Sequence, residues 1–411
     1  MKKTSKLFIS KLAVAFTVVL FFSITSCTKE KGIETVYNGN TFISPSDENG
    51  KVIPGKYIVV LKQSVINSSK LSSNLTYQER NSVVKSEIKA ILNSNNIPEK
   101  AIERTYNKAL IGFSGELSFE QVEALKKDYR VDYIEEDKIV ALGKGKPSGG
   151  GGTPTPSQST PWGISRVGTA DGTGKIAWII DSGIDLDHPD LNVNVTLSKS
   201  FLTSGGNYQS PDDGNGHGTH VAGTIAAKNN TIGVVGVAAN ATVIAVRVLN
   251  AKGSGTTSGV INGVDYVAAN GTAGNVANLS LGGGISTTLD NAVIAAAANG
   301  IMFALAAGNE TDNANNHSPA RANGANIYTV SAMNNLDTWA SFSNYGNSVD
   351  YCAPGVNITS TWKGGGYNTI SGTSMAAPHV AGILLITGGN PVTNGFVIGD
   401  PDGNADPIAH I

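Results

Sequence analysis

Residues 160–411 alternate short apolar segments with helical segments, and this alternation constrains the fold more than any other feature of the chain. Two of these segments, residues 258–269 and 288–298, carry apolar side chains at helical spacing. Strands that alternate with helices predict a parallel, doubly wound α/β sheet, with its site beyond the carboxyl ends of the strands. The strands expected to be buried on both faces are residues 175–180, 242–248, 276–279, 301–306 and 327–332.

A separate, small α+β domain is predicted over residues 51–142. Its helix at residues 81–92 places Val84, Ile88 and Leu92 on one face, and Ser118 with Gln121 forms a capping box ahead of a second helix. Residues 143–159 then contain four consecutive glycines and two prolines, a composition typical of a flexible linker. The strands expected in the small domain are residues 57–61, 111–115 and 131–140.

Charge is distributed unevenly between these two parts. Residues 28–141 carry 16 basic and 16 acidic side chains, whereas residues 159–411 carry 8 basic and 16 acidic ones. An acidic, sparsely charged domain repels phosphate backbones, so nucleic acid is not expected as a partner.

The first 27 residues predict an export signal. Four lysines precede the uncharged residues 12–24, which are too few to span a bilayer but suit the apolar region of a signal peptide. The segment ends in Ile24-Thr-Ser-Cys27, which resembles a bacterial lipobox, so we expect cleavage before Cys27 and lipidation of its thiol. The alternative is an ordinary secretory signal with an incidental cysteine. The protein is therefore expected to be exported, either as a cell-envelope lipoprotein attached to the membrane through Cys27 or as a secreted extracellular protein. If Cys27 is acylated, Cys352 has no intramolecular disulfide partner.

Three residues at or near the predicted strand ends suit acyl transfer. Asp181 follows the first apolar strand, His217 lies in a glycine-rich segment before a helix expected to begin at Val221, and Ser374 precedes the last apolar helix. Acyl transfer needs a nucleophilic hydroxyl, an imidazole that takes its proton, and a buried carboxylate that holds the imidazole. The three residues supply one of each.

These segments resemble the subtilisin-like serine proteases, specifically the proteinase K-like branch. The order Asp, His, Ser is that of this fold and differs from the order in α/β-hydrolases. The resemblance runs from Pro161 to about Ile386, so residues 160–411 are expected to be the peptidase domain. It is carried by seven motifs in family order: Asp181-Ser-Gly183, Asn215-Gly-His-Gly-Thr-His220, Gly253-Ser-Gly255, Leu279-Ser-Leu-Gly-Gly-Gly284, Ala306-Ala-Gly-Asn309, Phe342-Ser-Asn-Tyr-Gly346 and Gly372-Thr-Ser-Met-Ala376.

The resemblance implies a role for each motif. Ser374 would be the nucleophile, His217 its general base and Asp181 the residue that orients His217, while Asn309 would donate its amide to the oxyanion. A broad-specificity endopeptidase for polypeptide substrates is expected, with no cofactor required for the chemistry. The segments between which a peptide substrate would lie are Gly253, Ser254 and Gly255 on one side and Ser280, Leu281 and Gly282 on the other.

The same resemblance places the primary specificity pocket. Ala306 and Gly308 would line one wall, residues 280–282 the other, and His317 the floor, with Glu310 near the rim. Wall residues with small side chains would leave space for a large apolar residue, so Leu, Phe or Tyr is expected before the scissile bond. A protonated His317 would also widen acceptance to acidic residues near pH 5.5. In this branch Asp350 would also bind a structural Ca²⁺ together with backbone carbonyls at residues 323–326.

Residues 51–142 resemble, more loosely, the inhibitor-like prodomain of these proteases. Such a domain would dock its last strand in the substrate cleft, assist folding, and inhibit the enzyme as an intramolecular partner until it is cut off near Leu142. A monomeric, self-processed zymogen is therefore expected. The alternative for this domain is an unrelated adaptor.

Three other functions remain as alternatives. A catalytically silent peptide-binding surface lipoprotein would share the fold but would not react with a serine-directed reagent. An esterase is disfavoured because Gly372-Thr-Ser-Met-Ala376 lacks the second glycine of a nucleophile elbow. A zinc hydrolase using His217 and His220 is disfavoured because no Glu lies between them and no Cys cluster is present.

Overall fold

The computed structural model describes residues 45–66, 71, 75–143 and 157–411. They belong to a unit that runs from Ile43 to Ile411, and the following description concerns that unit. The predicted signal segment 1–27, with Cys27, and most of the predicted linker 143–159 lie outside the described residues.

A ten-stranded sheet forms the centre of the larger domain, and its strand order is β20-β21-β17-β16-β14-β12-β6-β10-β7, with β8 also paired to β10. All pairs are parallel except β20–β21. Strand β6 lies between β10 and β12, which both follow it along the chain, so the strand order reverses at β6. Asp181, the carboxylate predicted for the site, is the last residue of β6. The inner strands are β6 (Ile176–Asp181), β10 (Thr242–Arg247), β12 (Val276–Leu279), β14 (Met302–Ala306), β16 (Ile327–Met333) and β17 (Tyr351–Pro354). The short strands at one edge are β7 (Asn192–Val193) and β8 (Lys199–Ser200).

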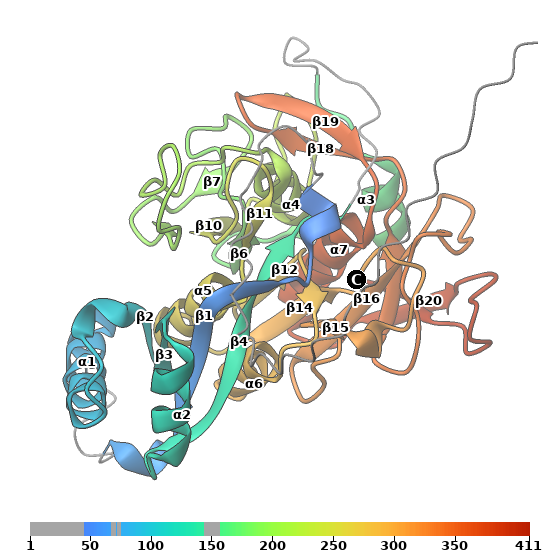
Figure 1. Ribbon diagram of the computed structural model, residues 1–411. Helices are drawn as coiled ribbons and strands as arrows, with labels where there is room; N and C mark the ends of the chain where they lie inside the picture. The colour runs from blue at the N-terminus through green and yellow to red at the C-terminus, as the bar shows by residue number, and fades with distance from the viewer. Residues whose placement is uncertain (1–44, 67–70, 72–74, 144–156) are drawn as a thin grey trace, which may run out of the picture. The chain divides into compact units, whose positions relative to one another are not determined.

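Helices cover both faces of this sheet (Figure 1). Helices α3 (Trp162–Val167), α4 (His217–Ala226) and α7 (Thr373–Thr387) bury their apolar side chains in one core. Helices α5 (Thr257–Asn270) and α6 (Thr287–Ala297) form a second core with the opposite face. The doubly wound α/β fold predicted from the alternating pattern is confirmed.

The smaller domain is an antiparallel sheet with two helices on one face. Its strands β1 (Val52–Leu61), β2 (Ile102–Asn107), β3 (Ile111–Glu116) and β4 (Val131–Ala141) pair in the order β4-β1-β3-β2. Helices α1 (Tyr77–Ser94) and α2 (Phe119–Lys127) bury their apolar faces against it and are both capped by capping boxes, from Thr76 and from Ser118. The other face of the sheet supplies Ile58 and Tyr106 to the core that contains α5 and α6.

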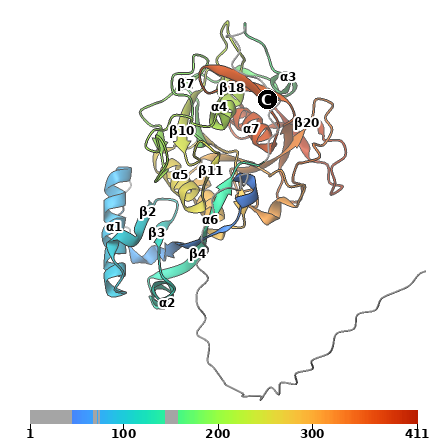
Figure 2. The ribbon, with the colours of Figure 1, turned by 45° about the horizontal axis from the view of Figure 1, so that its top comes forward.

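The last strand of the small domain extends into the large one (Figure 2). The end of β4 pairs antiparallel with β11 (Ser254–Thr256), with Ala141 opposite Ser254 and Ile139 opposite Thr256. A strand of the small domain therefore lies along the segment predicted to bind substrate.

Two parts of the larger domain differ from the sequence expectations. Helix α4 begins at His217, four residues before the expected Val221, because side chains outside the helix cap its first turn. Residues 388–411 are rich in Gly, Asp and Pro and were not expected to form strands, yet they form β20 (Val392–Phe396) and β21 (Pro407–His410), and β21 joins the sheet edge at β17.

The remaining elements are short. They are η1 (Pro45–Glu48), η2 (Gln63–Val65), η4 (Glu99–Ala101), β5 (Ala170–Asp171), β9 (Ala238–Ala239), β13 (Gly283–Gly284), η5 (Ala314–Asn316), β15 (His317–Ser318), β18 (Ile358–Trp362) and β19 (Gly366–Ile370).

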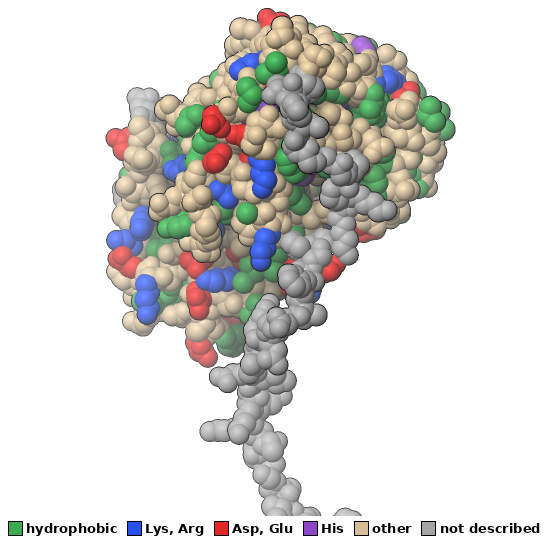
Figure 3. Space-filling view, turned by 90° about the horizontal axis from the view of Figure 1, so that it is seen from above, with side chains coloured by type: hydrophobic (Ala, Val, Ile, Leu, Met, Phe, Trp, Pro, Cys, Tyr) green, Lys and Arg blue, Asp and Glu red, His purple; other side chains and the backbone are tan. Residues whose placement is uncertain are grey.

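The surface agrees with the sparse charge of the sequence. The face in Figure 3 shows scattered acidic and basic side chains with wide uncharged areas between them.

Cys352 is free and fully buried. Burial raises the pKa of its thiol far above the usual range, so Cys352 is an inert core residue. No helix in the described part of the chain combines the length and the apolar character needed to cross a bilayer.

Candidate active site

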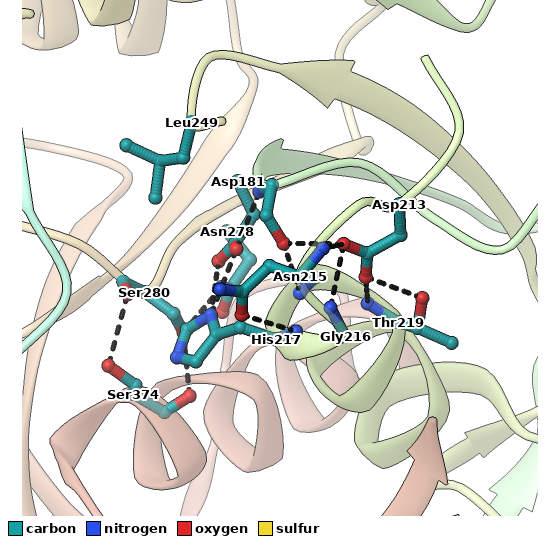
Figure 4. A network of polar contacts seen from close by, with 12 residues as sticks. Asp181, Asp213, Asn215, Gly216, His217, Thr219, Leu249, Asn278, Ser280 and Ser374 are labelled. Carbon is teal, nitrogen blue, oxygen red and sulfur yellow. Dashed lines mark hydrogen bonds and ion pairs between the residues drawn. The ribbon is translucent and has the colours of Figure 1, made fainter. Parts of the chain in front are cut away.

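Asp181 and His217 form a buried pair at the carboxyl end of the central strand. Asp181 is the last residue of β6 and is completely buried, and its two carboxylate oxygens each lie 2.9 Å from His217 Nδ1. Only a protonated nitrogen can donate to a carboxylate, so the proton of a neutral imidazole is on Nδ1 and Nε2 carries the free lone pair. In Figure 4 the edge of the ring away from Asp181 points toward Ser374.

The position of His217 depends on a close approach between two backbone segments. Gly218 follows His217 in the first turn of α4, and a Cβ atom there would lie 2.1 Å from the carbonyl oxygen of Gly183. Only glycine fits such a contact, which explains why the segment around the histidine is glycine-rich.

The charge state of His217 is set by burial and by carboxylates. Burial lowers the pKa of the imidazole, but the charge and hydrogen bond of Asp181 and the charge of Asp213 outweigh it, so the pKa is raised overall. The pair is thus arranged to stabilise an imidazolium once His217 has accepted a proton.

Asp213 caps the helix that carries His217, and sequence reasoning did not identify it. Its carboxylate accepts from the backbone N–H groups of Asn215 (2.9 Å), Gly216 (2.8 Å) and Thr219 (2.9 Å). It also accepts from the hydroxyls of Thr219 (2.7 Å) and Ser182 (2.9 Å). The N-cap residue Gly216 has no side chain, and the N–H groups of the first turn find other acceptors: Asp213 accepts from Thr219, Asn215 Oδ1 from His217 (3.3 Å) and Ser182 Oγ from Gly218 (3.0 Å). Asp213 lies eight residues before the expected helix start at Val221, so its capping role was not evident from the sequence.

Ser374 lies at the N-terminus of α7, where the helix begins after Gly372. Two reciprocal hydrogen bonds join Ser374 and Ser280. Ser374 Oγ donates to the Ser280 carbonyl (3.0 Å), and Ser280 Oγ donates to the Ser374 carbonyl (2.7 Å). No described residue accepts a hydrogen bond from the Ser374 N–H. This N–H is therefore available to an oxyanion.

The Asn309 amide is fixed so that its N–H₂ group faces the cleft. Its carbonyl oxygen accepts from the Thr373 backbone N–H (2.8 Å) and from Thr373 Oγ1 (3.0 Å). Thr373 Oγ1 in turn accepts from the Gly308 N–H (3.1 Å). Because the amide oxygen is occupied, Nδ2 is the free end. In the sequence Thr373 is one residue of the motif Gly372-Thr-Ser-Met-Ala376, and its spacing from Asn309 gives no sign of this contact.

The residues predicted for the specificity pocket come together. One pocket beside Ser374 and Asn309 is lined by the expected wall residues, by Glu310 and by His317. The lining residues from the larger domain include Ser280, Leu281, Gly282, Ala306, Ala307, Gly308, Ala320 and Thr373. The other predicted binding segment, Gly253, Ser254 and Gly255, lies along β4.

Two carboxylates flank the imidazole of the predicted pocket floor. His317 Nε2 lies 3.2 Å from Asp312 Oδ2, and His317 Nδ1 lies 3.9 Å from Glu310 Oε2. The Glu310 carboxylate is itself held by the Asn344 amide at 2.7 Å. A positive charge on His317 would be offset by these neighbours, so acidic substrate residues should gain little from its protonation.

The end of the small domain reaches this pocket through the residues on either side of Leu142. The Leu142 N–H donates to the Gly253 carbonyl (2.9 Å), and the Leu142 side chain packs over Gly253. Ala141 and Gly143 line the pocket instead, and a Cβ atom on Gly143 would lie 2.9 Å from Asn309 Nδ2. Because successive residues of a strand face opposite sides, Leu142 faces away from the pocket. Gly143 is therefore the residue beside the Asn309 amide, and a cut near Leu142 stays a prediction.

A metal site is not evident in the described residues. Within these ranges no three His, Cys, Asp or Glu side chains gather as a metal would require. His220 is buried and bonded through Nε2 to the Ile358 carbonyl (2.9 Å), and burial lowers its pKa to about 3, so it is a neutral core residue. Asp350 accepts from the Thr329 N–H (2.8 Å), and burial raises its pKa to about 6. Calcium at Asp350 would have this single carboxylate and backbone carbonyls as ligands, and it stays a prediction.

Comparison with known families agrees with this architecture. A model of the subtilase family matches residues 172–390, a range that contains Asp181, His217, Asn309 and Ser374. A model of the peptidase inhibitor I9 domain matches residues 56–143.

Individual relatives show the same likeness. Alkaline serine exoprotease A of Vibrio alginolyticus is 43% identical over 297 residues, which cover 69% of this chain and 53% of the relative, so this chain spans about half the length of that protein. The subtilisin-like serine protease AsES of Sarocladium strictum is 42% identical over 301 residues, covering 69% of this chain and 72% of the relative. The subtilisin-like serine protease Pen c 2 of Penicillium citrinum is 37% identical over 390 residues, covering 86% and 81%. Among solved structures, a cold-adapted subtilisin-like serine proteinase matches with a TM-score of 0.54 and 40% identity, covering 61% of this chain and 97% of that structure.

Proposed function

Because the chain belongs to the subtilase family and carries a peptidase inhibitor I9 domain ahead of its peptidase domain, we propose that it is a serine endopeptidase made as a zymogen, with Asp181, His217 and Ser374 as its catalytic triad. The observation that carries the proposal is the buried Asp181–His217 pair at 2.9 Å, with its free Nε2 edge directed toward a serine at a helix N-terminus.

The proposed chemistry gives each group of the site a role. Ser374 Oγ leaves the Ser280 carbonyl, gives its proton to His217 Nε2 and attacks the peptide carbonyl, while Asp181 stabilises the imidazolium. The oxyanion accepts from Asn309 Nδ2 and from the Ser374 N–H. His217 then protonates the leaving amine, and water repeats the sequence on the acyl-enzyme to release the acid.

The substrate class follows from the cleft. The pairing of β4 with β11, and the bond from the Leu142 N–H to the Gly253 carbonyl, support a role for the segment Gly253–Gly255 in holding an extended substrate chain. Backbone pairing accepts many sequences, and the small wall residues Ala306 and Gly308 leave room for a large apolar side chain in the pocket. We therefore infer a broad endopeptidase that prefers Leu, Phe or Tyr before the scissile bond.

Self-processing is inferred at the bond after Gly143. Gly143 lies beside the proposed oxyanion donor, so its carbonyl is the one that Ser374 would attack. The purified precursor should give a new N-terminus at Lys144, followed by trimming of the linker. The Ser374→Ala chain, made without other proteases, should keep the small domain attached, and its release there would refute self-processing.

The triad is tested by activity and by labelling. Single Ala substitutions of Asp181, His217 and Ser374 should each remove most casein hydrolysis, and combined substitutions should add little further loss because the three act as a unit. A serine-directed fluorophosphonate should label the wild-type chain at Ser374. Casein hydrolysis at the wild-type rate by Ser374→Ala would overturn the mechanism.

Export and lipidation form a separate part of the proposal. The Lys-rich start, the apolar residues 12–24 and the lipobox-like Ile24-Thr-Ser-Cys27 support an exported protein acylated at Cys27. Mass spectrometry of the precursor isolated from its cells should show Cys27 as the first residue with an added lipid mass, and an unmodified Cys27 would contradict this.

A further inference from the structure

The residues just before the inhibitor-like domain contact the proposed substrate cleft. We call residues 45–51 the leading segment; it consists of η1 (Pro45–Glu48), Asn49, Gly50 and Lys51 and precedes β1. It lies outside residues 56–143, which carry the inhibitor likeness. Asn49, a residue of the leading segment, lines the same pocket as Ser374 and Asn309.

Asn49 bridges the small domain and the cleft with both ends of its amide. Asn49 Nδ2 donates to the Gly282 carbonyl at 3.0 Å, and Asn49 Oδ1 accepts from the Ala141 N–H at 2.9 Å. A carbonyl can only accept and a backbone N–H can only donate, so the two partners fix the orientation of the amide.

Backbone bonds hold the leading segment in the same place. The Gly50 N–H donates to the Ile139 carbonyl (2.8 Å), and the Ile139 N–H donates to the Lys51 carbonyl (2.9 Å). Gly50 has a φ of 79°, and a Cβ atom on it would lie 3.0 Å from the backbone nitrogen of Gly284. Glycine is therefore required where the segment passes the cleft wall.

The inhibitory tail is consequently enclosed on two sides. Residues 139–141 pair with β11 on one side and contact the leading segment on the other. Gly282 belongs to the segment expected to bind a substrate backbone, yet its carbonyl is occupied by a side-chain amide from outside the tail. A linear peptide substrate carries no equivalent of the leading segment.

We propose that the leading segment is a second inhibitory element, in which Asn49 fastens the tail to the Gly282 side of the cleft and retains the small domain there after self-cleavage. This inference rests on the proposed protease function and extends it to residues that the inhibitor likeness does not include. Two hydrogen bonds to uncharged groups are lost with the amide, so retention should weaken by about tenfold or more when Asn49 is removed.

The contact is tested first without catalysis. Three full chains, all carrying Ser374→Ala, are compared by hydrogen–deuterium exchange of residues 139–143. One has no further change, one adds Asn49→Ala, and the matched control adds Asn93→Ala, which changes an exposed asparagine on α1. Exchange in this segment should be about tenfold faster for Asn49→Ala and unchanged for the control. Unchanged exchange for Asn49→Ala would overturn the proposal.

The consequence for activity is tested on the self-processed full chain. After dilution, the lag before hydrolysis of a fluorogenic peptide should be about tenfold shorter for Asn49→Ala than for wild type and for Asn93→Ala. Asn49→Asp, which can still accept from the Ala141 N–H but cannot donate to Gly282, should also shorten the lag. An unchanged lag in both Asn49 variants would overturn the retention role. If no variant, wild type included, hydrolyses peptides, the protease function fails, while the exchange measurement still decides the contact.

Discussion

Replacing Asp213 by Asn should destabilise the loop that presents His217 and shift the pH dependence of catalysis at the same time. The carboxylate accepts three backbone N–H groups and two hydroxyls, at 2.7 to 2.9 Å, and it is buried. Asn has the same shape but only one accepting oxygen. One group of donors must therefore face the new N–H₂ group, whichever way the amide turns.

The size of the effect follows from these bonds. The less harmful orientation turns the N–H₂ group toward Thr219, whose hydroxyl can rotate to accept while its backbone N–H loses its partner. An orphaned buried N–H costs about 1–3 kcal/mol, and the bonds from Asn215 and Gly216 each lose about 1 kcal/mol when the acceptor loses its charge. We expect the free energy of unfolding to fall by about 3–5 kcal/mol.

The assay is guanidinium unfolding of the full chain in the Ser374→Ala background, which prevents self-digestion. Asp212→Asn is the matched control, because Asp212 is the exposed neighbour and accepts only a long bond of 3.4 Å from the Leu186 N–H. The control should change stability by less than about 0.5 kcal/mol.

The pH profile gives an independent readout in the active chain. The charge of Asp213 helps to raise the pKa of His217, so Asp213→Asn should lower that pKa. The general base works only when neutral, so activity is lost as the pH falls through the pKa of His217, and a lower pKa moves this loss to lower pH. A stability loss below about 1 kcal/mol together with an unmoved acid limb would refute the role assigned to Asp213.

Four further predictions concern catalysis, ions and specificity. Asn309→Ala should lower kcat by about 10²–10³-fold with little change in KM, since the amide donates mainly to the oxyanion; a fall in kcat of less than tenfold in steady-state kinetics would contradict this. The acid limb of kcat/KM in the self-processed enzyme should lie above pH 6.5, because the pKa of His217 is raised overall, and a limb centred near pH 5.5 would count against the geometry. If Ca²⁺ is bound at Asp350, chelation should lower the melting temperature by several degrees and Asp350→Asn should abolish that response, whereas a melting temperature insensitive to chelator would exclude the ion. Peptide-library profiling should show Leu, Phe or Tyr before the scissile bond at pH 8 and no gain for acidic residues at pH 5.5, because Glu310 and Asp312 flank His317; a strong Lys or Arg preference at pH 8 would mean that these carboxylates dominate the pocket.

The amino-acid pattern indicated the two domains, most of their strands and helices, and the Asp, His and Ser residues of the site, whereas Asn309 and the binding segments were identified through the family resemblance. These features are local: a strand repeats every two residues, a helix every 3.6, and each motif places its reactive side chain at a fixed position relative to a strand end or helix start. Asp181, for example, directly follows an apolar segment, and a parallel sheet places such ends along one edge.

Only the tertiary structure decided how these side chains are held and which residues reach the cleft from elsewhere. The start of α4 at His217 depends on Asp213, the direction of the Asn309 amide depends on Thr373, 64 residues away, and Asn49 meets Gly282 across 233 residues. The position of Gly143 beside Asn309 Nδ2 depends on the register between β4 and β11, which belong to different domains. Hydrogen bonds between distant segments leave no periodic trace in the sequence, because their geometry exists only once the chain has packed.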